Sequence, residues 1–319
     1  MQFPLWSLSA ILIAMISLSV PANHAVAYGD DPRLLKRNAE LEAENRALRK
    51  ILGGIQDALK SVPKSSVQEA ADSQSLRIVV VPGEWGGSEL ADIKKVCASA
   101  AGTILAQLPD DGFAPILVER GKGSPITLFR RGEGNEYIVR LDTSDRAWAQ
   151  CAFQFAHEFG HIVCNYREVE NPQLWFEESL CECASLFALR RMAVEWRTNP
   201  PYSNWKSYST SLTDYASNRI AQFEERKEST AEFYKQHQKE LEKTATNRDL
   251  NGFVALKLLP LFEKTPGAWQ SLRYLNLGDP KENKAFADYL SGWHDRVPAE
   301  HKAFVRSVAA EFEFDLLKK

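Results

Sequence analysis

Cysteine is scarce, with five residues in a chain of 319. Because five is an odd number, a chain in which every cysteine pairs within the same molecule is excluded. Most of the five lie in segments with a helical pattern, where cysteine often serves as a small buried apolar residue. A disulfide between Cys164 and Cys181 stays open, and the pairing of the full set is not predicted: Cys97, Cys151, Cys164, Cys181 and Cys183.

The chain lacks a large excess of charge of either sign. The 39 Lys and Arg residues against 42 Asp and Glu residues give a formal net charge of -3. This balance argues against nucleic acid as a partner, because proteins that bind it usually carry a strongly basic surface. The glycine cluster at residues 82–87 lacks the Lys-Ser/Thr pair of a phosphate-binding P-loop. The sequence shows no internal repeats.

An apolar run from Leu5 to Val20 is short for a transmembrane span and precedes Ala25-Val26-Ala27, a small-x-small cleavage site. These features predict a signal peptide over residues 1–27 and an exported protein, whether periplasmic, extracellular or membrane-anchored. The residues before the run lack Lys and Arg. An uncleaved membrane anchor therefore stays open as the alternative.

Residues 28–60 predict a coiled-coil helix, and the polar residues 61–75 a flexible linker. Apolar residues recur every seven positions, and a second seam position holds two asparagines that favour a parallel dimer. A homodimer through residues 31–60 is one interpretation, and a single amphipathic helix lying on the folded domain is the other. The seam residues are Leu34, Leu41, Leu48 and Ile55 with Asn38, Asn45, Leu52 and Leu59.

A folded domain is expected from Leu76 onward. Apolar periodicity predicts a strand, a helix, three strands and a second helix, at residues 77–81, 88–108, 116–119, 126–130, 137–141 and 147–165. Beyond Ala193 the chain reads as mainly helical, with helices at 212–246, 253–262, 268–275, 284–293 and 299–314. Four aromatic residues in this part are expected in the core: Trp269, Trp293, Phe304 and Phe312.

The helix at 147–165 carries His157-Glu158-Phe159-Gly160-His161, an H-E-x-x-H pattern. Histidines four residues apart lie one helical turn from each other, so both imidazoles can reach one metal ion. The glutamate beside the first histidine then faces a water on the open coordination position, where a general base is needed. A buried core helix with two hydrogen-bonded histidines is the alternative.

A third ligand is expected from the next helix, which follows Asn171-Pro172 and contains Trp175-Phe176-Glu177-Glu178-Ser179-Leu180-Cys181-Glu182. The pair HEFGH and WFEESLCE resembles the gluzincin class of zinc metallopeptidases, in which a glutamate on the second helix completes a His-His-Glu site. The resemblance covers residues 135–190 and aligns Glu178 with that ligand. Ser179 replaces the usual glycine, and Glu177 is the alternative ligand.

The resemblance implies that Zn²⁺ is held by His157, His161 and Glu178, with Glu158 as the general base for hydrolysis of a peptide bond. It also implies that Glu182, one turn after Glu178, hydrogen-bonds a ligand histidine. Such enzymes add a group that stabilises the oxyanion. Among Tyr202, Tyr208, Tyr215, His237 and His294, Tyr215 is our choice.

The predicted fold is α+β, with a zincin-like catalytic lobe at residues 76–195 and a helical C-terminal lobe at 196–319. The zincin resemblance makes the last strand before the motif helix an edge strand, so that residues 136–140 would pair with an extended peptide; an internal strand is the alternative. The predicted function is an exported zinc metallopeptidase acting on peptides or proteins. The alternatives are an inactive zinc-binding scaffold that uses the coiled coil and a membrane-tethered structural protein without metal.

Overall fold

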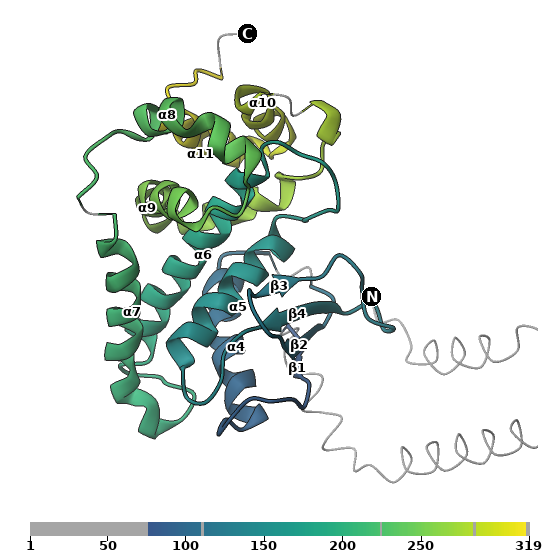
Figure 1. Cartoon of the computed structure of the whole chain (residues 1–319), viewed down its shortest axis with the longest axis vertical. Coiled ribbons are helices and arrows are strands. Elements are labelled where there is room, and N and C mark those ends of the chain that lie inside the picture. The colour runs from purple at the N-terminus through teal and green to yellow at the C-terminus, as the bar shows by residue number, and fades with distance from the viewer. Residues whose placement is uncertain (1–75, 110–111, 224, 283–284, 317–319) are drawn as a thin grey trace, which may run out of the picture. The chain divides into compact units, whose positions relative to one another are not determined.

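A computed structural model describes residues 76–109, 112–223, 225–282 and 285–316. The predicted signal peptide, coiled-coil helix and linker, at residues 1–27, 28–60 and 61–75, lie outside this part of the chain. The described part is an α+β fold with one small mixed sheet and many helices (Figure 1). Within it, no helix combines the length and the apolar character needed to cross a membrane.

The sheet has four strands, β1 (Ile78–Val80), β2 (Ile116–Arg120), β3 (Ile126–Thr127) and β4 (Tyr137–Leu141), in the order β1-β2-β4-β3. The first three in this order run parallel, and β3 is antiparallel to β4. The helix α4 (Leu90–Leu105) connects β1 to β2, as parallel neighbours require a crossover. Predicted and observed strands agree, except that the strand expected at 126–130 is only two residues long.

The predicted edge position of residues 136–140 is wrong, because β4 lies between β2 and β3. The strand β3 closes the sheet instead, with Ile126 paired to Arg140 and Thr127 to Val139. The order of the strands in the sequence does not reveal this arrangement, because β3 precedes β4 in the chain but pairs with the edge of β4 that faces away from β2. The free edge of the sheet next to the motif helix is therefore β3.

The helices α5 (Trp148–Val163) and α6 (Leu174–Glu195) form the centre of the fold. The long helix α6 packs against α4, α5, α7 and α9, and its burial on nearly all sides matches a sequence that is apolar around the whole helix after its acidic first turns. The motif helix α5 lies between α4 and α6 and also contacts β3 and β4. This arrangement places the start of α6 beside the end of α5.

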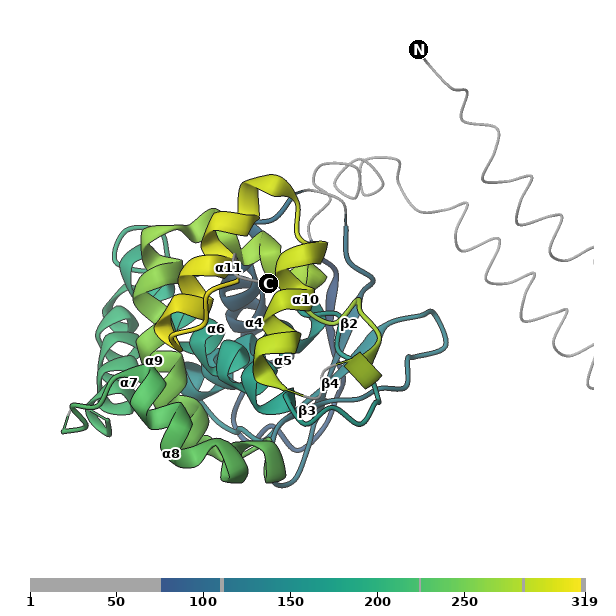
Figure 2. The same cartoon turned by 90° about the horizontal axis from the view of Figure 1, so that it is seen from above.

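The C-terminal part contains α7 (Ser209–Ala221), α8 (Thr230–Lys243), α9 (Arg248–Lys264), α10 (Phe286–Arg296) and α11 (Ala299–Glu311), with short 3-10 helices η1 (Ser203–Tyr208), η2 (Pro266–Tyr274) and η3 (Pro280–Glu282). Within the described part of the chain, the helices α8, α10 and α11 gather at the end away from the sheet (Figure 1), and α10 and α11 lie side by side (Figure 2). The four aromatic residues predicted for the core, Trp269, Trp293, Phe304 and Phe312, are all buried, which confirms that prediction.

The single helix predicted at 212–246 is wrong, because the chain forms α7 and α8 with a break between them. Ser229 and Glu232 form a capping box, in which the Ser229 hydroxyl oxygen accepts from the Glu232 backbone N–H and the Glu232 carboxylate accepts from the Ser229 N–H. This S-x-x-E pattern is a sequence signal for a helix start. The segment predicted as a helix at 268–275 is the 3-10 helix η2.

All five cysteines are buried free thiols, so the Cys164–Cys181 disulfide is not formed. The sulfur of Cys181 instead lies where α5 and α6 cross closely at Gly160. A β-carbon on Gly160 would lie 3.0 Å from Cys181 Sγ and 3.1 Å from Cys181 Cα. The glycine of the motif therefore lets α5 and α6 approach each other.

Replacing Gly160 with alanine is expected to lower the free energy of unfolding by about 1–3 kcal/mol, the usual cost of overpacking a core. The added methyl group meets the Cys181 backbone, which cannot move without shifting α6. Urea unfolding measures the change. The matched control is Gly102→Ala in α4, where a β-carbon meets nothing within 4 Å; there alanine should stabilise by about 0.5–1 kcal/mol. Equal effects at both glycines would contradict the close crossing.

Candidate metal centre

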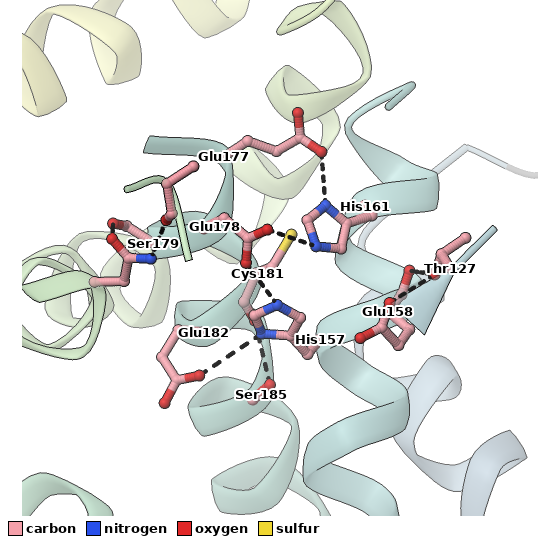
Figure 3. Close-up of polar contacts among 12 residues, drawn as sticks. Thr127, His157, Glu158, His161, Glu177, Glu178, Ser179, Cys181, Glu182 and Ser185 are labelled. Carbon is pink, nitrogen blue, oxygen red and sulfur yellow. Dashed lines mark hydrogen bonds and ion pairs between the residues drawn. The ribbon is translucent and has the colours of Figure 1, made fainter. Parts of the chain in front are cut away.

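The helix α5 turns His157 and His161 toward the first turns of α6 (Figure 3). Its opposite face is buried, with Phe155 and Phe159 fully enclosed in the core. The two imidazole rings lie with their centroids 5.1 Å apart, as expected for side chains one helical turn apart. The amphipathic pattern of the sequence therefore produces the arrangement that we predicted from it.

The helix α6 brings Glu178 to both histidines. Its Oε2 lies 3.1 Å from His157 Nε2, and its Oε1 lies 3.7 Å from His161 Nε2. One ligand atom from each of the three residues lies within 4.8 Å of the others, so His157, His161 and Glu178 could hold a metal ion together. The side chains are partly buried and face a common cavity.

The other ring nitrogens of the histidines contact two further carboxylates. Glu177 Oε1 lies 2.6 Å from His161 Nδ1, and Glu182 Oε2 lies 3.6 Å from His157 Nδ1. Arg219 in turn donates a hydrogen bond of 2.8 Å to Glu182 Oε1. Carboxylates at Nδ1 favour the tautomer whose Nε2 lone pair is free for a metal. The surroundings of the two histidines, and not only the three candidate ligands, thus suit a metal ion.

The sequence prediction for Glu182 agrees with this placement, although Glu182 lies at ion-pair distance from His157 rather than in a short hydrogen bond. Glu177 does not face the two Nε2 atoms; its carboxylate contacts Nδ1 of His161 instead. The sequence did not reveal this role of Glu177. The helical spacing offered a signal, because two consecutive glutamates point about 100° apart around a helix and cannot serve one position.

The acidic surroundings change the protonation of the metal-free site. Burial by itself lowers the pKa of His157, but the nearby carboxylates of Glu178, Glu182 and Glu158 together outweigh it and raise the pKa to about 10. The pKa of His161 is also raised, since the carboxylates of Glu177 and Glu178 together outweigh burial, which by itself lowers it. Burial favours a higher pKa for Glu178 and Glu182, yet the contact of each with His157, together with the charge of His161 on Glu178 and of Arg219 on Glu182, lowers it. A cation that binds here replaces protons on the imidazoles.

We expect the metal-free protein to lose stability as the pH rises from about 6.5 to about 10. Over this window the folded state keeps a proton on His157 that the unfolded chain has released, because its folded pKa is about 10 and its ordinary value is 6.5. The stabilisation is complete below the unfolded pKa and disappears through the folded one. Urea unfolding of chelator-treated protein across this range measures it. A His157→Gln variant should show a flatter pH dependence; an equally steep one would contradict the assignment.

Glu158 is 2 % exposed and lies at the boundary between α5 and the sheet. The Thr127 hydroxyl lies 2.8 Å from Glu158 Oε2 and 3.1 Å from the Glu158 carbonyl oxygen. Thr127 belongs to the edge strand β3, so the strand and the carboxylate are joined directly (Figure 3). The sequence analysis did not identify Thr127, because its contact depends on the position of β3 in the sheet.

These side chains line one cavity of about 450 Å³. Glu158, His157, His161 and Glu178 face it together with residues of β3, α7 and the start of α9. Of the five oxyanion candidates, all in the described part of the chain, Tyr215 alone lines this cavity. Its ring packs on Phe153 at a centroid distance of 5.5 Å, and burial raises the pKa of its hydroxyl, which keeps it protonated.

Two of the other candidates have different environments. The hydroxyl of Tyr208 donates to the Arg146 carbonyl and accepts from the Ala149 N–H. His294 lies beside Arg306 and Asp295. The cavity also contains Tyr166, which was not predicted, but its hydroxyl donates to the Leu128 carbonyl at 2.7 Å. Tyr215 is thus the member of the five candidates whose side chain lines the cavity.

Comparison with known proteins assigns no family to the chain: no protein-family model, no curated protein and no solved structure matches it significantly.

Proposed function

We propose that the protein is a zinc-dependent metallopeptidase of the gluzincin type, with a zincin-like catalytic core. The observation that carries the proposal is the convergence of His157, His161 and Glu178 within 4.8 Å, with Glu158 lining the same cavity. A helix with H-E-x-x-H followed by a glutamate ligand on the next helix supplies the three protein ligands of a hydrolytic zinc site. A fourth position then remains for water or substrate.

Zinc is the metal that best suits this donor set. Two imidazole nitrogens and one carboxylate oxygen form a small mixed N/O site, which zinc accepts readily, whereas magnesium and calcium favour sites made of oxygen atoms alone. A bound zinc ion supplies Lewis acidity, which lowers the pKa of a water and polarises a carbonyl group. His157, His161 and Glu178 would hold it.

Glu158 would act as the general base. Glu158 lines the same cavity as the histidines, and its carboxylate would accept a proton from the attacking water and deliver it to the leaving amine. The hydroxyl of Thr127, 2.8 Å from Glu158 Oε2, holds the carboxylate in one orientation. The protonated hydroxyl of Tyr215 is our candidate for the donor that stabilises developing negative charge on the substrate carbonyl.

The substrate we propose is a peptide or protein segment in extended conformation. The edge strand β3 has one side free within the sheet, and pairing of a peptide with such an edge gives it direction. Ile126 and Phe129, about half exposed at 48 % and 50 %, line the cavity at this edge and offer apolar contacts. Backbone pairing at β3 would bring a peptide bond past Thr127 toward Glu158.

The expectations for residues 1–75 complete the proposal. A signal peptide at 1–27 would export the enzyme, and the coiled-coil helix would join two copies through residues 31–60. Nucleic acid is not a proposed partner, given the net charge of -3.

Zinc stoichiometry and digestion of a peptide library by purified residues 28–319 test the proposed function. One zinc per chain and cleavage that a chelator abolishes and zinc restores are the expected results. One zinc without cleavage of any peptide favours the inactive scaffold. Absence of zinc, cobalt or manganese binding would overturn the metal site itself and favour a structural protein.

A further inference from the structure

A buried chain of hydrogen bonds runs from the C-terminal helix α10 to the metal-ligating face of α5. The Tyr289 hydroxyl donates to Asn276 Oδ1 at 2.9 Å, and Asn276 Nδ2 donates to Glu177 Oε2 at 2.6 Å. Glu177 Oε1 then lies 2.6 Å from His161 Nδ1. The four residues come from α10, the segment before η3, α6 and α5.

Every residue of this hydrogen-bond chain except His161 is buried. Tyr289, Asn276 and Glu177 are 0 %, 6 % and 2 % exposed. Buried hydrogen bonds that leave no partner unpaired hold their groups in one arrangement, because breaking any of them costs the desolvation of a polar group. The chain is therefore a rigid support for His161 and not a surface contact exposed to water.

The direction of each hydrogen bond follows from its neighbours. Asn276 Nδ2 faces the Cys164 carbonyl oxygen at 3.1 Å as well as Glu177, and both are acceptors. The amide nitrogen must therefore point at them, which leaves Oδ1 to accept from Tyr289. Glu177 Oε2 accepts from Asn276 Nδ2, and Glu177 Oε1 faces His161 Nδ1 at 2.6 Å, so His161 donates a hydrogen bond from Nδ1. Its Nε2, on the side of Glu178, is then the ring nitrogen available to a metal ion.

The two histidines are supported differently. On His157, Glu182 lies 3.6 Å from Nδ1 and is paired with Arg219, whose side chain is 26 % exposed. On His161, the contact with Glu177 is a full ångström shorter and is backed by neutral, buried groups. A carboxylate backed by neutral donors keeps more of its charge for the histidine than one neutralised by arginine.

We propose that Asn276 and Tyr289 are positioning residues of the metal centre, which fix the tautomer and direction of His161 through Glu177. The proposal rests on the metal site described above and extends it into the C-terminal part of the chain. According to this proposal, the C-terminal part of the polypeptide is necessary for tight metal binding, although it contributes no ligand. Outer partners of metal-bound histidines commonly change metal affinity about 10–100-fold.

The test uses the Tyr289→Phe variant, which removes one hydroxyl from a buried ring and leaves its packing in place. Competition with a chelating dye should show zinc affinity reduced about tenfold relative to the wild type. The Co²⁺-loaded variant should show altered d–d absorption bands, because the imidazole that binds the ion is no longer held in one orientation. Global destabilisation moves neither readout while the protein remains folded.

Tyr234→Phe is the matched control. Tyr234 is also a buried tyrosine in the C-terminal part; its ring packs on Trp175, and its hydroxyl is not a member of the hydrogen-bond chain that ends at His161. Removal of its hydroxyl should change neither the zinc affinity nor the Co²⁺ absorption bands. Equal zinc affinities and equal cobalt spectra for the two variants would overturn the proposal.

Glu177→Gln provides a second, independent variant in case the loss of the Tyr289 hydroxyl is compensated by a water. The amide keeps the shape of the side chain but removes the negative charge next to His161, and a loss of zinc affinity of about a hundredfold is expected. Unchanged affinity in this variant would equally overturn the proposal. Failure of the metal site itself is seen separately, in the wild-type protein, as absence of zinc binding.

Discussion

Replacing Glu158 with glutamine should lower kcat/KM about a thousandfold and leave zinc affinity almost unchanged. The amide keeps the size of the side chain and can still accept the hydrogen bond from Thr127, 2.8 Å away. It cannot accept a proton from water, and proton transfer by a positioned side chain is commonly responsible for a factor of about 10²–10⁴. The measurement pairs steady-state cleavage of the best library peptide with zinc stoichiometry of the same sample.

Glu168→Gln is the control for this prediction, because Glu168 is an exposed glutamate in the loop that follows the motif helix. It should retain wild-type cleavage. If Glu158→Gln cleaves as fast as Glu168→Gln with zinc bound, another group acts as the base. If neither the wild type nor the variants cleave any peptide, the scaffold interpretation gains and the intact motif serves metal binding alone.

Replacing Glu178 with glutamine should lower zinc affinity by about a hundredfold or more, and cleavage with it. The loss should exceed the range of about 10–100-fold that is typical for an outer partner of a histidine, because a ligand atom and a negative charge are both removed. Glu178 is the residue whose two oxygens face Nε2 of both histidines, at 3.1 and 3.7 Å. Dye competition measures the affinities.

Glu182→Gln is the comparison for the Glu178 variant. It lies one turn further along α6 and contacts His157 at the other ring nitrogen, 3.6 Å away. Its effect should be smaller, since it removes an outer contact that Arg219 already neutralises in part. A larger loss of zinc affinity in Glu182→Gln than in Glu178→Gln would show that Glu178 is not the third ligand.

The parts of the site that follow from local periodicity could be predicted from the sequence. The pair His157 and His161 and the placement of Glu178 and Glu182 on one face of the next helix need only a 3.6-residue repeat and a short connection. The structure brings these four side chains together. The small mixed sheet and the α+β class follow likewise from the alternation of short apolar runs and helical patterns.

The parts that depend on distant segments could not be predicted. Asn276 lies 99 residues from Glu177 in sequence and reaches it only through the packing of the C-terminal helices. Thr127 contacts Glu158 because β3 folds back along β4, and nothing in its two residues distinguishes an edge strand from an internal one. The break between α7 and α8, by contrast, could have been predicted from the sequence, because the capping box at Ser229 is a local signal for a helix start. The apolar periodicity across residues 212–246 obscured this signal.

The close crossing of α5 and α6 at Gly160 has a consequence for the order of assembly. His157, His161 and Glu178 sit on helices that are already held together by buried apolar residues and by carboxylate–imidazole contacts. Zinc fingers, by contrast, have no such core and remain unfolded until the ion arrives. For the proposed zinc enzyme, the polypeptide would therefore reach its final conformation first and bind its ion afterwards.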